Sequence, residues 1–176
     1  MKKFINTIIR KKSQHTAGYI IIHIYVDKNK NMILVPYKLC KVGYAVATEP
    51  YEKVSHTEWE KVSVHIVDLL RKVEKEPFAE DTRTQVMKQI CGSQGFKQFS
   101  KKHICIMARY WISEKTFEIS NEPRLSDGSY GMEKGTISEM YCIEYTSTDN
   151  IAEIQENFMK AYGDAERYLE RIGSKL

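Results

Sequence analysis

The stretch of the chain that decides the fold reads Tyr19-Ile20-Ile21-Ile22-His23-Ile24-Tyr25-Val26. One set of alternate positions is entirely apolar and β-branched, whereas the other set mixes apolar, aromatic and polar side chains. A period of two is typical of a β-strand, because successive side chains of a strand point to opposite faces of the sheet. The stretch therefore predicts a strand with one deeply buried face and one mixed face.

Two further strands are expected after this one. Residues 27–31 form a polar turn between two apolar runs, which is typical of a β-hairpin. The returning strand, over residues 32–40, contains Pro36, whose missing N–H predicts a place at a sheet edge or at a bulge. A third strand is expected over residues 44–54, with Pro50 at its frayed end.

A helix is predicted to follow these strands. Ser55 and Glu58 have the spacing of a capping box, and apolar side chains then recur every three or four residues as far as Val73. This period predicts a helix with one apolar stripe that packs on the sheet. Two shorter helical stretches are expected at residues 82–91 and 95–102.

The second half of the chain returns to strand patterns and ends in a long helix. Apolar side chains recur every three or four positions from Ile151 to Ile172. Gly163 lies within this helix and predicts a bend or a break, because glycine costs about 1 kcal/mol relative to alanine there. The longest loop is expected over residues 121–135. Strands are expected at residues 103–111, 116–120 and 139–145.

Strands linked as hairpins, without regular strand–helix–strand alternation, predict an α+β fold. We expect a mainly antiparallel sheet of about five or six strands with helices packed on one face. The chain is interpreted as a basic amino-terminal segment, residues 1–17, followed by a single α+β domain, residues 18–176. A chain of 176 residues buries about 70% of its unfolded surface, so it forms a core without disulfides.

The net charge of +4 is unevenly distributed along the chain. Residues 1–41 carry a net charge of +8, residues 42–102 carry +1 and residues 103–176 carry −5. The basic part favours contact with phosphates or anionic lipid, whereas the acidic part favours basic proteins. No apolar run is long enough to span a membrane, and no signal peptide is recognised. The four cysteines show no disulfide pattern, so a cytoplasmic location is expected.

Known catalytic and cofactor motifs are missing from the sequence. It contains no nucleophile elbow, no phosphate-binding loop, no dinucleotide fingerprint and no closely spaced cysteines that would bind zinc. We therefore expect no cofactor and no metal. His23 and His103 leave a hydrolase open, since each shares a strand face with another ionisable side chain.

Four blocks of the sequence follow one another in an order known from a protein family. They read Gly18-Tyr19-Ile20-Ile21-Ile22-His23-Ile24-Tyr25, Asn31-Met32-Ile33-Leu34-Val35-Pro36-Tyr37, Gly43-Tyr44-Ala45-Val46-Ala47-Thr48-Glu49-Pro50 and Phe96-Lys97-Gln98-Phe99-Ser100-Lys101-Lys102-His103-Ile104-Cys105-Ile106. This order, over residues 4–162, resembles bacterial contact-dependent growth inhibition (CDI) immunity proteins. The resemblance implies a protein that is not an enzyme. It implies instead a heterodimer with a cognate toxin domain, commonly a nuclease, whose active site or substrate path is blocked.

Such families diverge at the contact surface, so the toxin-binding residues are predicted from side-chain chemistry. Tyrosine supplies a large anchor, and acidic side chains steer a basic partner toward the surface. Both kinds of residue occur around the end of the third strand and in or beside the loop over residues 121–135. The predicted toxin-binding residues are Glu49, Tyr51, Glu52, Glu118, Glu122, Asp127, Tyr130 and Glu133.

The basic amino-terminal region supports an alternative function. A small nucleic-acid-binding protein would combine these lysines and arginines with the nearby tyrosines, on which bases stack. Its affinity for a generic oligonucleotide would fall steeply with salt. No RNA-recognition or helix-turn-helix pattern accompanies the basic region.

Overall fold

The computed structural model describes residues 18–173 with six internal gaps, and for residues 141–144 it describes the backbone alone. The basic segment, residues 1–17, lies outside the described residues, so the division of the chain at residue 18 stays a prediction. The gaps are Lys41, Pro77, residues 80–84, Ser126, residues 132–140 and residues 145–149.

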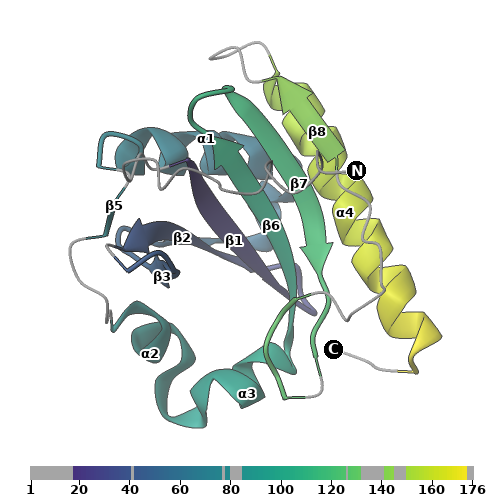
Figure 1. The fold of residues 1–176 in the computed structure, drawn as a ribbon. Coiled ribbons are helices and arrows are strands. Elements are labelled where there is room, and N and C mark those ends of the chain that lie inside the picture. The colour runs from purple at the N-terminus through teal and green to yellow at the C-terminus, as the bar shows by residue number, and fades with distance from the viewer. Residues whose placement is uncertain are drawn as a thin grey trace, which may run out of the picture.

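The core of the molecule is one β-sheet, whose strands follow the order β3-β2-β1-β6-β7-β8 (Figure 1). Neighbouring strands along this path are antiparallel, and the short β5 (Phe78–Ala79) pairs with β2 in parallel. The α+β class and the mainly antiparallel sheet are therefore confirmed. The longer strands are β1 (Tyr19–Asp27), β2 (Met32–Cys40), β6 (His103–Trp111), β7 (Thr116–Glu122) and β8 (Tyr141–Glu144).

The strand expected over residues 44–54 is two short strands. β3 (Ala45–Ala47) and β4 (Glu52–Val54) both pair with β2, at opposite ends of it. The residues between them leave the ladder, and the Glu49–Pro50 peptide bond in this connection is cis. The sheet therefore contains more strands than the five or six expected, because one predicted strand is divided and β5 is added.

Pro36 lies on β2, which has paired strands on both sides, so its predicted place at an edge or bulge is wrong. It pairs with Ile22 of β1, and its carbonyl oxygen accepts a hydrogen bond from the Thr48 N–H at 2.8 Å on the other side. The N–H and C=O of one strand residue point to the same neighbour. The missing N–H of Pro36 thus points into the break between β3 and β4.

The first face of the sheet is covered by two helices, α1 (Val62–Val73) and α4 (Ile151–Arg171). Figure 1 shows α1 behind the sheet and α4 alongside β7 and β8. The 3₁₀ helix η1 (His56–Lys61) precedes α1 and buries Trp59 against α4. The apolar side chains that β1 contributes to this layer are those expected from the sequence: Ile20, Ile22, Ile24 and Val26.

The second face is covered at one end only, by helices that the sequence analysis had not assigned to this side. α2 (Val86–Cys91), the 3₁₀ turn η2 (Gly92–Gln94) and α3 (Gly95–Ser100) lie beside the start of β6, at the bottom of Figure 1. Their apolar side chains form a second core with the end of β1. Its buried members are Tyr25, Val35, Ala47, Val86, Cys91, Phe99 and Cys105.

Two expectations about the last third of the chain differ from the structure. α4 runs without a break through Gly163. The expected loop over residues 121–135 begins inside β7, and Arg124 and Tyr130 then form an isolated β-bridge. Among the described residues, no helix is both long enough and apolar enough to cross a membrane.

Candidate protein-binding surface

The second face of the sheet carries a group of large polar and aromatic side chains at the end that α2 and α3 leave uncovered. We call Tyr19, Arg109, Trp111 and Glu118 the aromatic surface. They come from β1, β6 and β7, with Tyr19 directly opposite Trp111 and Arg109 directly opposite Glu118. Side chains directly opposite each other on neighbouring strands share a face. All four are partly exposed, and none belongs to either buried core.

Arg109 is the centre of this surface. Its Nη1 lies 3.2 Å from Oε2 of Glu118, in a salt bridge whose two side chains are 28% and 19% exposed. The guanidinium carbon lies 5.4 Å from the ring centre of Tyr19 and 5.6 Å from that of Trp111. The two rings meet edge to face at 5.3 Å. These cation–π and aromatic contacts hold the four side chains in one arrangement.

Two hydrogen-bond donors in this surface have no acceptor. The Nε atom of Arg109 and the Nε1 atom of Trp111 are shielded from solvent and have no hydrogen-bond partner within the described chain. A shielded donor without a partner costs about 1–3 kcal/mol, so native proteins contain few of them.

A chain of hydrogen bonds lies beside the second core, on the same face of the sheet. Nδ1 of His23 lies 3.2 Å from the Tyr25 hydroxyl, which lies 2.9 Å from the hydroxyl of Tyr37. Burial, helped by the nearby charge of Arg109, lowers the pKa of His23 to about 4. Burial also raises the pKa of Tyr25 well above its usual value and that of Tyr37 to about 12. All three side chains are therefore uncharged at neutral pH.

The two histidines considered for a hydrolase, His23 and His103, both pack and form hydrogen bonds within the fold. His23 is neutral and bonded to a tyrosine, as described above. His103 stacks on Phe99 with ring centres 3.9 Å apart, and its Nδ1 lies 2.8 Å from the Phe99 carbonyl oxygen. Burial lowers the pKa of His103 as well. Among the described residues, no group of three or more His, Cys, Asp or Glu side chains is placed to hold a metal ion.

The first group of predicted toxin-binding residues lies at β4. Glu49 is exposed, whereas Tyr51 packs partly buried against the second core. Glu52 points toward α1, where its Oε1 lies 2.8 Å from Nδ1 of His65. The second oxygen of Glu52 is shielded and has no partner within the described chain. This end of the sheet therefore presents fewer free acidic groups than the sequence suggested.

The second group of predicted residues lies on β7 and the turn after it. Glu118 belongs to the aromatic surface, and Asp127 is exposed. Glu122 is largely buried, and this burial raises its carboxyl pKa although Arg109 opposes the shift. Tyr130 packs on the second core and donates its hydroxyl to the His103 carbonyl oxygen at 2.8 Å. Glu133 lies outside the described residues.

Tyr51 and Tyr130 both pack on the second core, but the strands that carry the acidic residues Glu52 and Glu118 lie apart. β2, β1 and β6 separate β4 from β7, which amounts to roughly 19 Å at the usual strand spacing. The sequence analysis missed Tyr19, Arg109 and Trp111 as candidates. One signal was available: alternation along β6 places a charged and a large aromatic side chain together on the face opposite the apolar core.

No protein-family model and no curated protein matches this sequence. One similar solved structure is a protein of unknown function, NMB0488, from Neisseria meningitidis. It has a TM-score of 0.59 and 7% sequence identity, and the match covers 86% of this chain and 99% of that chain. A chain of a CdiA-CT/CdiI toxin and immunity complex from Yersinia pseudotuberculosis has a TM-score of 0.47 and 10% identity, covering 82% of this chain and 96% of that one. The Neisseria match shows a shared fold, and the Yersinia match has no bearing on function at this score.

Proposed function

We propose that this protein is an immunity protein that binds a cognate bacterial toxin domain through the aromatic surface, and that it acts by binding without catalysing a reaction. The sequence resemblance to CDI immunity proteins supports the class. The composition of the surface supports its place, because Trp, Tyr and Arg carry most of the binding energy in protein interfaces.

The observation that carries this proposal is the pair of shielded donors on Arg109 and Trp111. Both atoms are shielded in the free protein, so each would gain a hydrogen bond only if a neighbouring side chain shifts and a partner's carbonyl or carboxylate oxygen takes its place. A hydrogen bond to a buried, charged group is among the stronger ones, at about 1.5–3 kcal/mol. The toxin segment that binds here therefore presents acceptor oxygens and a flat apolar side chain that packs on Tyr19.

The surface is suited to the centre of an interface. The four side chains are already held by one another, so little side-chain entropy is lost when a partner binds. A standard interface buries about 800 Å² on each protein, which extends well beyond these four residues. Glu118 and the exposed Glu114 of the β6–β7 turn would then lie within or near the rim of the interface.

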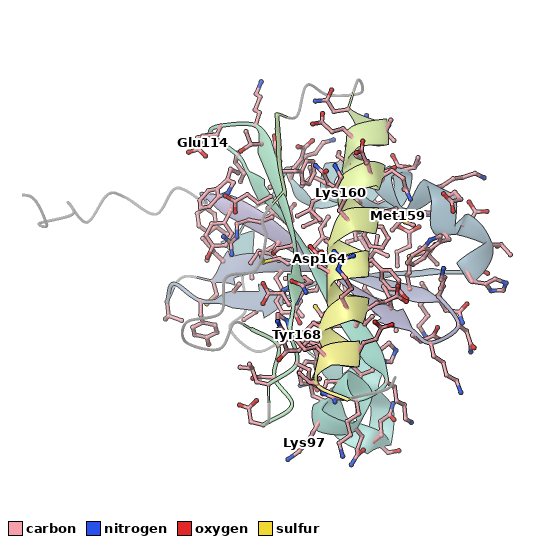
Figure 2. All side chains as sticks on the ribbon, turned by 90° about the vertical axis from the view of Figure 1, so that its right-hand side faces the viewer. Lys97, Glu114, Met159, Lys160, Asp164 and Tyr168 are labelled. Atoms are coloured by element: carbon pink, nitrogen blue, oxygen red, sulfur yellow. The ribbon has the colours of Figure 1, made fainter. Side chains whose placement is uncertain are left out.

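The proposal predicts that the gene immediately upstream encodes a large exoprotein, and the experiment uses the toxin domain at the carboxy terminus of that exoprotein. Co-expression of the wild-type protein is expected to rescue cells that produce this domain, and purified protein is expected to bind it. Trp111→Ala should weaken binding by about 2 kcal/mol, roughly thirtyfold. Lys160→Ala, on the solvent side of α4, serves as the control and should leave binding unchanged (Figure 2).

Trp111→Phe tests the shielded donor itself. This variant keeps a ring and removes the N–H, so the free protein should be as stable as the wild type or slightly more stable. Binding should nevertheless weaken by roughly tenfold, as expected for one lost hydrogen bond. Rescue that is unaffected by both Trp111 variants would mean that the toxin binds elsewhere, and failure of the wild type to bind or rescue would reject the proposed function.

A further inference from the structure

A second candidate site lies far along the chain from the aromatic surface, where α3 meets the last turns of α4. It is an open pocket of about 400 Å³. Figure 2 shows two of its residues from the solvent side: Tyr168 on the lower part of α4, and Lys97 on α3 below it. The lining residues are Lys97, Lys101, Arg124, Leu125, Gly128, Tyr168 and Ile172.

The charge of this pocket has one sign. Its lining, as far as the structure describes the chain, contains three cationic side chains and no carboxylate. A fourth cation, Arg171, lies over the Tyr168 ring with its guanidinium carbon 5.4 Å from the ring centre. Arg124 donates from Nη1 to the Ser100 carbonyl oxygen at 3.4 Å, which holds its guanidinium at the pocket wall. Cations gathered in a concave site attract an anion with more than one negative charge.

One nearby carboxylate interacts with these cations, because the charge of Lys97 helps to lower the pKa of Asp127. Asp127 is exposed, and its Oδ1 accepts hydrogen bonds from the Ser129 N–H at 2.8 Å and the Ser129 hydroxyl at 2.6 Å. Glu122 lies outside the pocket lining, and the cation that acts on its pKa is Arg109. The exposed Lys102 of the turn after α3 bonds to an uncharged side chain, Gln94, at 3.0 Å.

The pocket wall is built by a close contact between the turn after β7 and α3. Gly128 has a φ of +91°, and a Cβ atom there would lie 2.9 Å from Cγ of Lys97 and 3.2 Å from its Cα. The turn is closed by hydrogen bonds from Leu125 N–H to the Ser129 carbonyl at 2.8 Å and from Gly128 N–H to the Leu125 carbonyl at 3.0 Å. The backbone of Lys97 is therefore fixed against the turn before any ligand binds, which lowers the entropy cost of binding.

We infer that this pocket binds the phosphate of a nucleotide, with the base or sugar against Tyr168. The cations provide the charge-assisted hydrogen bonds that phosphate oxygens need. The Tyr168 ring, Leu125 and Ile172 provide a flat apolar wall for the rest of the ligand. A volume near 400 Å³ lies in the range of small-ligand sites. The same chemistry is offered by a free nucleotide and by the phosphorylated end of a nucleic acid strand.

Titration calorimetry of the full-length protein tests this assignment with four probes: ATP, pyrophosphate, a 5′-phosphorylated trinucleotide and the same trinucleotide without its phosphate. ATP should bind with a dissociation constant on the order of 100 µM, and pyrophosphate more weakly because it lacks a ring. Binding of the phosphorylated trinucleotide but not of ATP would also support the site and identify a strand end as its ligand. Equal binding of both trinucleotides would contradict a phosphate site.

Paired variants separate this pocket from general charge. Lys97→Gln with Lys101→Gln should weaken ATP binding by roughly tenfold or more. Lys72→Gln with Lys75→Gln, two exposed lysines around the end of α1, removes the same charge and should have no effect. The inference is wrong if neither ATP nor the phosphorylated trinucleotide binds, or if both double variants weaken binding equally. These titrations do not measure toxin binding, so their result neither supports nor contradicts the proposed function, which has its own test.

Discussion

The side-chain oxygen of Gln155 accepts a hydrogen bond from the backbone N–H of Ser63 at 3.0 Å, at the second position of α1. The first amides of a helix have no partner within the helix, and a side chain just before the helix usually supplies one. Lys61, at the cap position of α1, makes no such bond. The amide nitrogen of Gln155 also donates to the Trp59 carbonyl at 3.1 Å. α4 therefore caps α1 across 92 positions of sequence.

Gln155→Ala should lower the free energy of unfolding by about 1–2 kcal/mol, because it removes a helix cap and leaves two backbone groups without their partner. Urea denaturation followed by circular dichroism would measure this change. The neighbouring exposed residue provides the control: Glu156→Ala breaks only the surface salt bridge to Lys160, worth about 0.3–0.5 kcal/mol. Equal losses in the two variants would show that the Gln155 bonds contribute nothing specific.

Tyr130 was predicted from the sequence as a toxin-binding anchor, and its contacts suggest a different experiment. Tyr130→Phe should cost about 1 kcal/mol of unfolding free energy through the lost bond to the His103 carbonyl. Tyr130→Ala should cost about 3 kcal/mol, because its ring also packs on Phe96 and Tyr25. Thermal unfolding of both variants would check these values. A stable Tyr130→Ala variant that no longer binds toxin would support the original prediction that Tyr130 contacts the toxin.

The partly buried His23 should make the protein less stable in mild acid. Its pKa is about 4 in the folded protein and near 6.5 in the unfolded chain, so the unfolded chain takes up the proton first as pH falls. Stability that is fully present above pH 6.5 is therefore lost between about pH 6.5 and 4, by up to about 3 kcal/mol. The groups facing the ring are the Tyr25 hydroxyl, the Tyr37 ring and the Arg109 charge.

Denaturant unfolding at several pH values between 4 and 7 measures this effect. His23→Gln serves as the matched variant, since it keeps a polar side chain but takes up no proton. Its unfolding free energy should fall less steeply with decreasing pH than that of the wild type. Parallel curves for the two proteins would show that His23 does not titrate differently in the folded and unfolded states.

Gly128→Ala should destabilise the protein more than the same change at Gly43. Both glycines have a φ close to +90°, so both variants carry the same type of backbone strain, of about 1 kcal/mol. Only at Gly128 would the added Cβ meet other atoms, those of Lys97; nothing lies within 4 Å at Gly43. We expect the melting temperature to fall further for Gly128→Ala. Equal decreases in melting temperature for the two variants would show that Lys97 moves away from the added Cβ atom at little cost.

Local sequence patterns predicted most individual strands well. They predicted poorly which elements lie next to each other in the folded sheet. The stretch over residues 103–111 was expected as a strand and is β6 with the same bounds, because alternation depends only on nearby residues. The position of Pro36 was predicted wrongly because a proline fits within β2 only where β3 and β4 end, and the local sequence does not show where they end. α2 and α3 were expected as helices, but only the folded sheet determines which face has room for them.

The candidate surface was harder to predict than the fold for the same reason. Tyr19 and Trp111 become neighbours only when β1 pairs with β6, and Glu118 reaches Arg109 only through the β6–β7 register. The predicted acidic and tyrosine residues were chosen by chemistry along the chain. Residues such as Tyr130 and Glu122 turn inward there, because the sheet and α3 enclose them.

The position of β1 between β2 and β6 has a consequence for synthesis on the ribosome. One edge of β1 is paired as soon as the hairpin with β2 forms, but its other partner, residues 103–111, emerges about 80 residues later. At 5–20 residues per second this interval lasts roughly 4–16 seconds. Throughout it the nascent chain exposes an isoleucine-rich strand edge, which is a template for aggregation. Newly made protein should therefore depend on chaperones until β6 arrives.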